Sequence, residues 1–298
     1  MADAKSPSSW TGLRAAPAVA PERDAADREF AYSLADFERV RQLIYQHAGI
    51  SLSPIKQDMV YSRLARRLRA TGMTTFASYL DALEAKRGDE WECFVNSLTT
   101  NLTSFFREPH HFPILAEQLR RIGKKRPVRI WCSAASTGEE PYSIAMTVAD
   151  TFGSDTSHVS IMASDLDTNV LATAEKGIYS LDRVEKVPPD QLRKFFLRGT
   201  GGQEGFVSVR PELRRMVTFH RINLLDASYA VKGPLDVIFC RNVMIYFDRP
   251  TQYKILSRFA PMMQPDGLMF AGHSENFMHA ADLFKSQGKT VYALANAP

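Results

Sequence analysis

Residues 128–149 read VRIWC, SAASTGEEPYS and IAMTVA, which predicts a strand, a turn and a helix in succession. Open α/β sheets bind nucleotides at such a turn, because it follows the carboxyl end of a strand. The turn holds one glycine, Gly138, and two adjacent acids, Glu139 and Glu140. It lacks the G-x-G-x-x-G pattern that lets backbone amides approach a pyrophosphate, and its acids would repel phosphate. The acids either offset the helix dipole or serve a ligand that has an amino group and no phosphate.

The chain beyond this stretch changes character along its length. From residue 128, short apolar runs such as VSIMASD and LDVIFCRNV alternate with helical segments, which predicts a doubly wound, mostly parallel sheet. The last two runs, GLMFAGH and TVYALA, favour an antiparallel pair at the sheet edge. The fold class is therefore α/β. Its predicted parts are a disordered extension at 1–30, an all-helical N-terminal domain at 31–105, a linker helix at 106–127, the sheet domain at 128–298 and an inserted β subdomain at about 178–215.

The composition is that of an ordinary globular protein, with 45% hydrophobic and 23% charged residues among 298. No apolar run approaches the roughly 18 residues of a membrane span, and the N-terminus lacks a signal-peptide pattern. Cys132 and Cys240 lie in apolar runs, so we expect buried thiols rather than disulfides or metal ligands. These features predict a cytoplasmic protein without membrane insertion, and the spacing of the histidines predicts no metal site.

Polar residues follow the ends of successive predicted strands. Asp165 ends the second strand, where an acid can bind ribose hydroxyls. Asn223 and Leu224 follow the third strand, where they offer a polar group and an apolar side chain to an adenine ring. Arg241 and Asn242 follow the fourth strand. Each residue alone is typical of a turn or cap, but together they favour a nucleoside with an amino-acid end, such as S-adenosylmethionine.

Five long motifs occur in order: NLTSFFRE (101–108), SAASTGEEPYSIA (133–145), ASDLDTNVLATAEKGIY (163–179), INLLD (222–226) and CRNVMIYFD (240–248). With them, the chain from about residue 33 to its end resembles the CheR-type chemotaxis receptor methyltransferases of bacteria. The resemblance implies a Rossmann-like methyltransferase domain, S-adenosylmethionine as methyl donor and S-adenosylhomocysteine as product. It also implies glutamate side chains on the cytoplasmic helices of chemoreceptors as acceptors, giving methyl esters for sensory adaptation.

The resemblance also assigns residues. Arg107 and Tyr246 are expected near the transferred methyl group as catalytic residues. The choice of Glu140 over Glu139 as a ligand contact stays open. The inserted subdomain of the family docks some receptors through a short C-terminal peptide, and we expect a monomer. Carried over motif by motif, the cofactor contacts are Asn101, Thr103, Arg107, Glu140, Asp165, Asn223, Leu224, Arg241 and Asn242.

The chemistry of the implied acceptor agrees with the residues present. A glutamate carboxylate is ionised at pH 7, with a reference pKa near 4.3, so its methylation requires no general base. Catalysis then rests on desolvation and in-line positioning. The planar fork of Arg107 can hold a carboxylate, or it can pair with Glu108 instead. Tyr246 can orient the acceptor or shield the methyl group, or it can simply pack between its apolar neighbours.

The segment YSRLARRLR forms a basic stretch of a predicted helix. Its arginines are Arg63, Arg66, Arg67 and Arg69. Spacings of three and four place the first three on roughly one helix face. This face is either solvated or an electrostatic patch for the acidic receptor helix, and we expect the second as the substrate-binding surface.

Three alternatives stay in view. A nucleic-acid methyltransferase is disfavoured, because Asn242 and Tyr246 are separated by VMI without the Asn-Pro-Pro-Tyr signature and the basic helix lacks interleaved aromatic residues. No nucleic-acid partner is therefore expected. A regulator that only binds S-adenosylmethionine is disfavoured by the intact motifs. A nicotinamide dehydrogenase is disfavoured by the missing glycine pattern.

Overall fold

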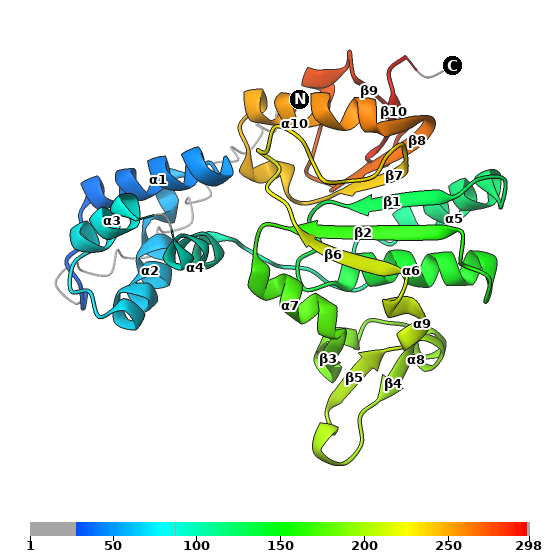
Figure 1. Ribbon diagram of the computed structural model, residues 1–298, viewed down its shortest axis with the longest axis horizontal. Helices are drawn as coiled ribbons and strands as arrows, with labels where there is room; N and C mark the ends of the chain where they lie inside the picture. Colours follow the sequence, from blue (N-terminus) through cyan, green and yellow to red (C-terminus); the bar gives the residue numbers. More distant parts are fainter. Residues whose placement is uncertain (1–27, 87, 297–298) are drawn as a thin grey trace, which may run out of the picture.

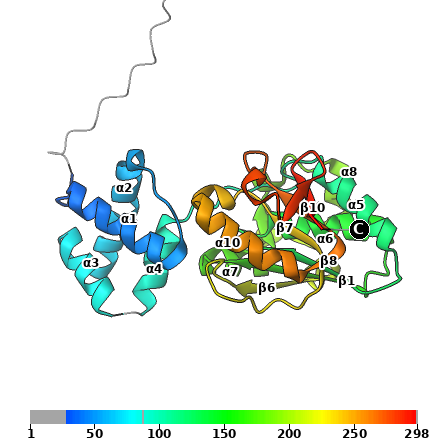
Figure 2. The same cartoon turned by 90° about the horizontal axis from the view of Figure 1, so that it is seen from above.

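The computed structural model describes residues 28–86 and 88–296, and it shows a helical domain beside an α/β domain (Figures 1 and 2). Ser33 begins the first helix with a capping box, and Gly49 ends it in the left-handed conformation. The apolar faces of the helices meet in a core that includes Phe37, Leu64 and Phe94. The helices of this domain are α1 (Leu34–Ala48), α2 (Gln57–Thr71), α3 (Phe76–Ala85) and α4 (Asp89–Leu98).

The start of the helical domain differs from the expected boundary. Most of the predicted disordered extension, residues 1–27, lies outside the described residues. Residues 28–30, which the sequence placed in that extension, pack on α2 instead. Phe30 is buried in the helical core, and Arg28 forms an ion pair of 2.5 Å with Asp58. Burial of the apolar ring of Phe30 explains why the helical domain begins before the expected boundary, because this burial stabilises the chain at residues 28–30.

The α/β domain is built on a mostly parallel sheet with strand order β6-β2-β1-β7-β8-β10-β9. The predicted antiparallel pair is present, since β10 runs antiparallel to β8. The edge strand β9 was not predicted, because the three residues FKS are too short and polar to read as a strand. The strands are β1 (Val128–Cys132), β2 (Val159–Asp165), β6 (Val217–Arg221), β7 (Leu235–Cys240), β8 (Met263–Ala271), β9 (Phe284–Ser286) and β10 (Val291–Leu294).

Helices cover both faces of this sheet. Tyr142 and Leu119 belong to the core on one face, whereas Trp131 and Phe259 belong to the core on the other. Cys132 and Cys240 are buried free thiols, as predicted. None of the described helices is both long and apolar enough to cross a membrane. The covering helices are α5 (His111–Ile122), α6 (Glu139–Phe152) and α7 (Thr168–Lys176) on the first face, and α10 (Arg249–Phe259) on the second.

A small antiparallel sheet is inserted between α7 and β6, at the bottom of Figure 1. Its buried side chains, such as Val184 and Phe196, are continuous with the core of the main domain. The inserted subdomain is therefore packed on the sheet domain rather than tethered to it. It consists of β3 (Ile178–Ser180), the 3-10 helix η3 (Leu181–Val184), α8 (Pro189–Phe195), β4 (Phe196–Arg198), β5 (Phe206–Val209) and α9 (Pro211–Arg214), with strand order β3-β5-β4.

Candidate functional site

A pocket lies between the two domains, at the carboxyl ends of β1, β2 and β7. Its walls come from the helical domain, from the segment that links α4 to α5, and from the loops after the strands. The space between protein atoms at this pocket is about 1020 Å³, which includes space open to solvent at its mouth. The predicted cofactor and catalytic residues all line it: Asn101, Thr103, Arg107, Glu140, Asp165, Asn223, Leu224, Arg241, Asn242 and Tyr246.

The loop after β1 uses its backbone amides within the protein. The N–H of Ala135 donates to the carbonyl of Ser164 at 2.8 Å, and the N–H of Gly138 donates to the carbonyl of Ala135 at 3.0 Å. The N–H of Ser136 donates to the Oδ2 atom of Asp165 at 2.8 Å. These amides are thus already bonded where a nucleotide loop would bind phosphate. The loop fits a ligand that has no phosphate.

The two adjacent acids of this loop point to different places. Glu139 has no exposed surface, and its carboxylate accepts hydrogen bonds from Thr137 and Arg183. Glu140 lines the pocket, where its Oε2 atom accepts a hydrogen bond of 2.8 Å from Arg241. Of the two acids, Glu140 is therefore the one that faces the ligand space.

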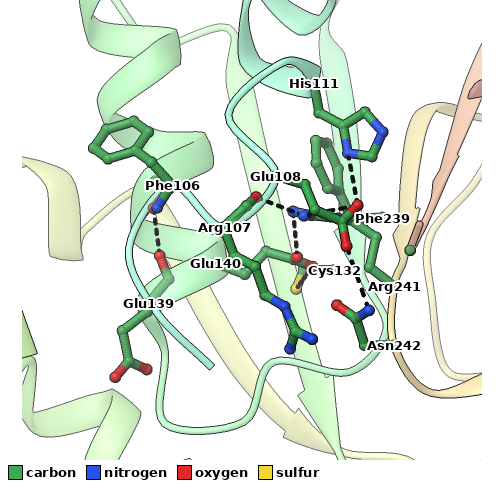
Figure 3. A network of polar contacts seen from close by, with 12 residues as sticks. Phe106, Arg107, Glu108, His111, Cys132, Glu139, Glu140, Phe239, Arg241 and Asn242 are labelled. Carbon is green, nitrogen blue, oxygen red and sulfur yellow. Dashed lines mark hydrogen bonds and ion pairs between the residues drawn. The ribbon is translucent and has the colours of Figure 1, made fainter. Parts of the chain in front are cut away.

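A buried network of charges lies at the floor of the pocket (Figure 3). Arg241 is buried between Glu140 and Glu108, with its Nη2 atom 3.3 Å from the Oε2 atom of Glu108. The same nitrogen donates to the carbonyl of Arg107. Burial opposes ionisation of Glu108, but Arg241 and the N–H of His273 lower its pKa to about 2. Burial raises the pKa of Glu140, against the attraction of Arg241.

The two predicted catalytic residues lie at the pocket without a carboxylate partner among the described residues. Arg107 donates to the carbonyl of Leu102 at 2.8 Å, and it does not pair with Glu108, which faces Arg241 instead. Tyr246 is partly exposed, and the Nζ atom of Lys56 lies 5.8 Å from the centre of its ring. The guanidinium and the phenol are therefore accessible from the ligand space.

Two predicted cofactor contacts have their side-chain amides bonded to protein groups. Asn223 donates to the carbonyl of His47 at 2.8 Å and so joins the two domains. Asn101 donates at 2.8 Å to Asp167, which also caps α7. Asp165 accepts from backbone N–H groups, while burial raises its pKa. The hydrogen bonds of these three side chains to protein groups hold the wall of the pocket in place.

The predicted basic face is partly neutralised within the chain. The Nη1 atom of Arg63 donates to the carbonyls of Leu98 and Thr99 at 3.0 Å and 2.6 Å. Arg63 thus supports the start of the segment that links α4 to α5. The spacing of residues in one helix could not show this contact, because its partners lie about 35 residues away in the sequence.

The other arginines of α2 divide into paired and free side chains. Arg67 forms two hydrogen bonds with the carboxylate of Glu90, and Arg69 pairs with Glu29. Arg66 is exposed and has no ion-pair partner among residues 28–86 and 88–296. Of the predicted patch, Arg66 is therefore the charge most available to a partner.

Glu275 is a residue of the site that the sequence did not single out. Its buried carboxylate accepts the backbone N–H groups of Asn242, Val243 and Met244 at 3.0, 2.9 and 2.8 Å, and also that of Gly272. It thereby holds the turn that carries Asn242 in the left-handed conformation, with φ of 57°. An acid two residues beyond the predicted strand GLMFAGH was the available signal.

Comparison with known proteins identifies the family. Residues 35–99 match the model of the CheR methyltransferase all-alpha domain, and residues 101–293 match that of the CheR methyltransferase SAM binding domain. The chain belongs to the CheR methyltransferase family. It is 56% identical to the chemotaxis protein methyltransferase of Escherichia coli K12 over 266 residues, 89% of this chain and 92% of the relative. It is 51% identical to chemotaxis protein methyltransferase 2 of Pseudomonas aeruginosa PAO1 over 280 residues, 94% of this chain and 100% of the relative.

Membership of the CheR family gives S-adenosylmethionine as the cofactor, and the pocket fits it. The backbone amides of Ala135, Ser136 and Gly138 are bonded within the protein, which agrees with a cofactor that carries no phosphate. Asp165 stands at the end of β2, where an acid can reach ribose hydroxyls, and Leu224 offers an apolar surface for adenine. When bound, this cofactor supplies a methyl group that is activated by a sulfonium centre. The predicted fold class, cofactor and methyltransferase family are confirmed.

Proposed function

We propose that this chain methylates glutamate side chains on the cytoplasmic helices of chemoreceptors, giving glutamate methyl esters. The observation that carries the proposal is the pair of accessible polar groups, Arg107 and Tyr246, in a pocket walled by both domains. An acceptor carboxylate that enters the pocket would meet a cation without a carboxylate partner among the described residues, and a phenol in the lining of the same pocket. The relatives named above are chemotaxis methyltransferases, which supports a receptor as substrate.

The residues present suit this reaction. A glutamate carboxylate is already ionised at neutral pH, so no side chain has to remove a proton. Arg107 holds the carboxylate through its planar fork and orients one oxygen toward the methyl group. Tyr246 donates to the other oxygen and helps to keep water from the reacting atoms. Enclosure between the domains weakens hydration of the carboxylate, which raises its reactivity.

The proposed partner is the cytoplasmic part of a receptor, and the protein acts as a cytoplasmic monomer. Lys56, which lines the pocket, and Arg66, which is exposed on α2, are basic groups that complement an acidic helix. The small inserted sheet has two strand edges, on β3 and β4, that suit a peptide strand. A C-terminal receptor peptide is the proposed occupant of that sheet.

Transfer of a labelled methyl group tests the proposal. The enzyme is incubated with labelled S-adenosylmethionine and either a purified receptor cytoplasmic fragment or duplex DNA. We expect label in the receptor fragment, and its release as methanol in mild alkali, because esters hydrolyse there and methylated amines do not. Label in DNA, or label in protein that resists alkali, would contradict an ester. Donor binding without transfer to any receptor would point to a regulator that only binds the cofactor.

A further inference from the structure

The inserted subdomain reaches back to the loop that follows β1. The Nε atom of Arg183, in η3, donates to the Oε1 atom of Glu139 at 3.0 Å, and its Nη2 atom contacts the same oxygen. That nitrogen also donates to the Oγ1 atom of Thr137 at 3.1 Å. From β3, the hydroxyl of Tyr179 donates to the carbonyl of Thr137 at 2.8 Å. One short segment of the insert thus binds both side chains that flank Gly138.

The loop also packs closely against the insert at Gly138. Gly138 has φ of 98°, and a Cβ atom at this position would lie 2.7 Å from the hydroxyl of Tyr179 and 2.8 Å from Ala174. Such distances are shorter than any tolerated contact, so the close approach requires glycine. Residues 137, 138 and 139 therefore each contact the insert or the helix that leads to it. Glu140, the next residue, lines the cofactor pocket.

Glu139 extends the connection to the segment that carries Arg107. Its backbone carbonyl accepts a hydrogen bond of 2.7 Å from the hydroxyl of Ser143. The same hydroxyl accepts the N–H of Phe106 at 2.9 Å. Glu139 and Ser143 are fully buried, so water does not compete for these bonds. A continuous polar path thus runs from Arg183 through Glu139 to the residue before Arg107.

We propose that Arg183 and Glu139 are positioning residues through which the inserted subdomain holds the cofactor loop in its binding conformation. The buried carboxylate of Glu139 requires a cationic partner, because an unpaired charge in this place is strongly unfavourable. Arg183 is that partner, and it comes from outside the cofactor pocket. Loss of the pair lets the loop move and displaces Glu140 and Phe106 together. The inference rests on the assigned cofactor and adds a role for the insert in binding it.

Binding of S-adenosylhomocysteine, measured by calorimetry on the full chain, tests the inference. Arg183→Met is expected to raise the dissociation constant about tenfold, a size typical of coupled neighbours. Arg193→Met is the matched control, since Arg193 lies in α8 of the same subdomain and is exposed. It is expected to bind as tightly as the parent chain. Equal affinities for the two variants would overturn the inference.

A second set of variants separates positioning from loss of folding. Arg183→Lys keeps the charge but not the fork, so it is expected to restore part of the affinity. Combining Arg183→Met with Glu139→Gln is expected to weaken binding by less than the product of the single effects, because the double variant leaves no unpaired buried charge. If the double variant weakened binding by the full product of the two single effects, with thermal unfolding unchanged in all variants, Arg183 and Glu139 would not act together. The measurement uses no acceptor, so it stands apart from the identity of the methylated substrate.

Steady-state kinetics supply a further readout. With the receptor fragment as acceptor, Arg183→Met is expected to raise KM for the donor while kcat at saturating donor falls much less. A merely structural defect would instead lower the amount of active enzyme and so reduce kcat without changing KM. A fall in kcat at unchanged donor KM would therefore count against the assignment.

Discussion

Arg241 lies 2.8 Å from Glu140 at the floor of the pocket, and both side chains are almost entirely buried. Neither charge is stable there alone, because desolvation of an unpaired ion in a protein interior costs several kcal/mol. The pair also fixes the loop that leads to Arg107, whose carbonyl accepts from the same guanidinium. Arg241, Glu140 and Glu108 at the floor of the pocket therefore stabilise one another.

Removal of either partner should affect stability and donor binding unequally. Arg241→Met leaves two buried carboxylates, Glu140 and Glu108, without their cation, so we expect a loss of about 3–5 kcal/mol in the free energy of unfolding. Glu140→Gln leaves Arg241 still paired with Glu108, and we expect a loss of about 1–3 kcal/mol with weaker donor binding. Urea denaturation and calorimetry with S-adenosylhomocysteine measure the two effects.

A surface arginine provides the control for these variants. Arg121 pairs with Asp266 while more than half of its side chain is exposed. Arg121→Met should therefore change the free energy of unfolding by about 1 kcal/mol or less. If Arg241→Met were no more damaging than Arg121→Met, the buried network would not hold the pocket as described.

His111 should make the stability of the protein depend on pH. Burial, aided by the charge of Arg241, lowers the pKa of His111 to about 4 from an ordinary value of 6.5. The unfolded chain therefore binds a proton between these values that the folded chain does not. The contribution of His111 to stability is therefore fully present above about pH 6.5 and is lost as pH falls toward 4, and this contribution amounts to about 3 kcal/mol. Glu108, whose pKa is lowered from 4.5 to about 2, adds a further loss of stability that begins below about pH 4.5.

A neighbouring histidine gives a matched test of that pH dependence. His111→Gln retains a donor for the carbonyl of Lys289, which the Nε2 atom of His111 contacts at 2.9 Å. We expect urea midpoints of this variant to vary less with pH than those of the parent, between about pH 7 and pH 5. His110 is exposed, so His110→Gln should keep the parent slope. If the urea midpoints of both variants varied equally with pH, His111 would not be the source of the pH dependence.

Glu275 should matter for turnover although it lies outside the reacting groups. Glu275→Ala leaves four backbone N–H groups without their acceptor, at a cost of about 1–3 kcal/mol for each group that stays unsatisfied. The turn that carries Asn242 and Tyr246 should then loosen, and kcat should fall. Glu275→Gln keeps one acceptor oxygen and the shape, so its kcat should lie between the parent and Glu275→Ala. If kcat of Glu275→Gln were lower than that of Glu275→Ala, Glu275 would not act as the hydrogen-bond acceptor of this turn.

Arg66 and Arg67 should respond differently to charge reversal. Arg66 is free, so Arg66→Glu should raise KM for the receptor fragment, more at low salt than at high salt, and leave donor affinity unchanged. Arg67 is bonded to Glu90, so Arg67→Glu should mainly destabilise the helical domain. Methylation assays at two ionic strengths and thermal unfolding separate these outcomes. If Arg66→Glu left KM for the receptor fragment unchanged, Arg66 would not belong to the surface that binds the receptor.

The fold was predictable because the signals that decide it are local. Strands of apolar residues and helices of 3.6-residue period alternate from Val128 onward, and that alternation specifies a parallel sheet. The pocket-lining residues at strand ends, such as Asp165 and Arg241, were predictable for a related reason, since the carboxyl ends of parallel strands converge on one edge. Asn101, Thr103 and Arg107 follow no strand and were assigned only through the family resemblance. The strand at Phe284–Ser286 escaped because a segment so short has no readable period.

The internal partners of these residues were not predictable. Glu139 and Arg183 are 44 residues apart, and Arg241 and Glu140 are 101 apart. A single sequence shows which side chains are charged but not which of them meet after folding. The choice between Glu139 and Glu140, which the sequence left open, depended on such pairings. The same limit explains why Arg63 reads as a surface charge although it supports the linking segment.

The hydrogen bond from Asn223 to the carbonyl of His47 crosses the seam between the helical and α/β domains. The carbonyl of Tyr246 accepts the N–H of Ser51 at 2.8 Å across the same seam. The two domains therefore cannot be treated as interchangeable parts. A chimera that joins the helical domain of one relative to the α/β domain of another should keep its donor site only when the facing loops, around residues 47–51, 223–225 and 246–247, are exchanged as a matched set.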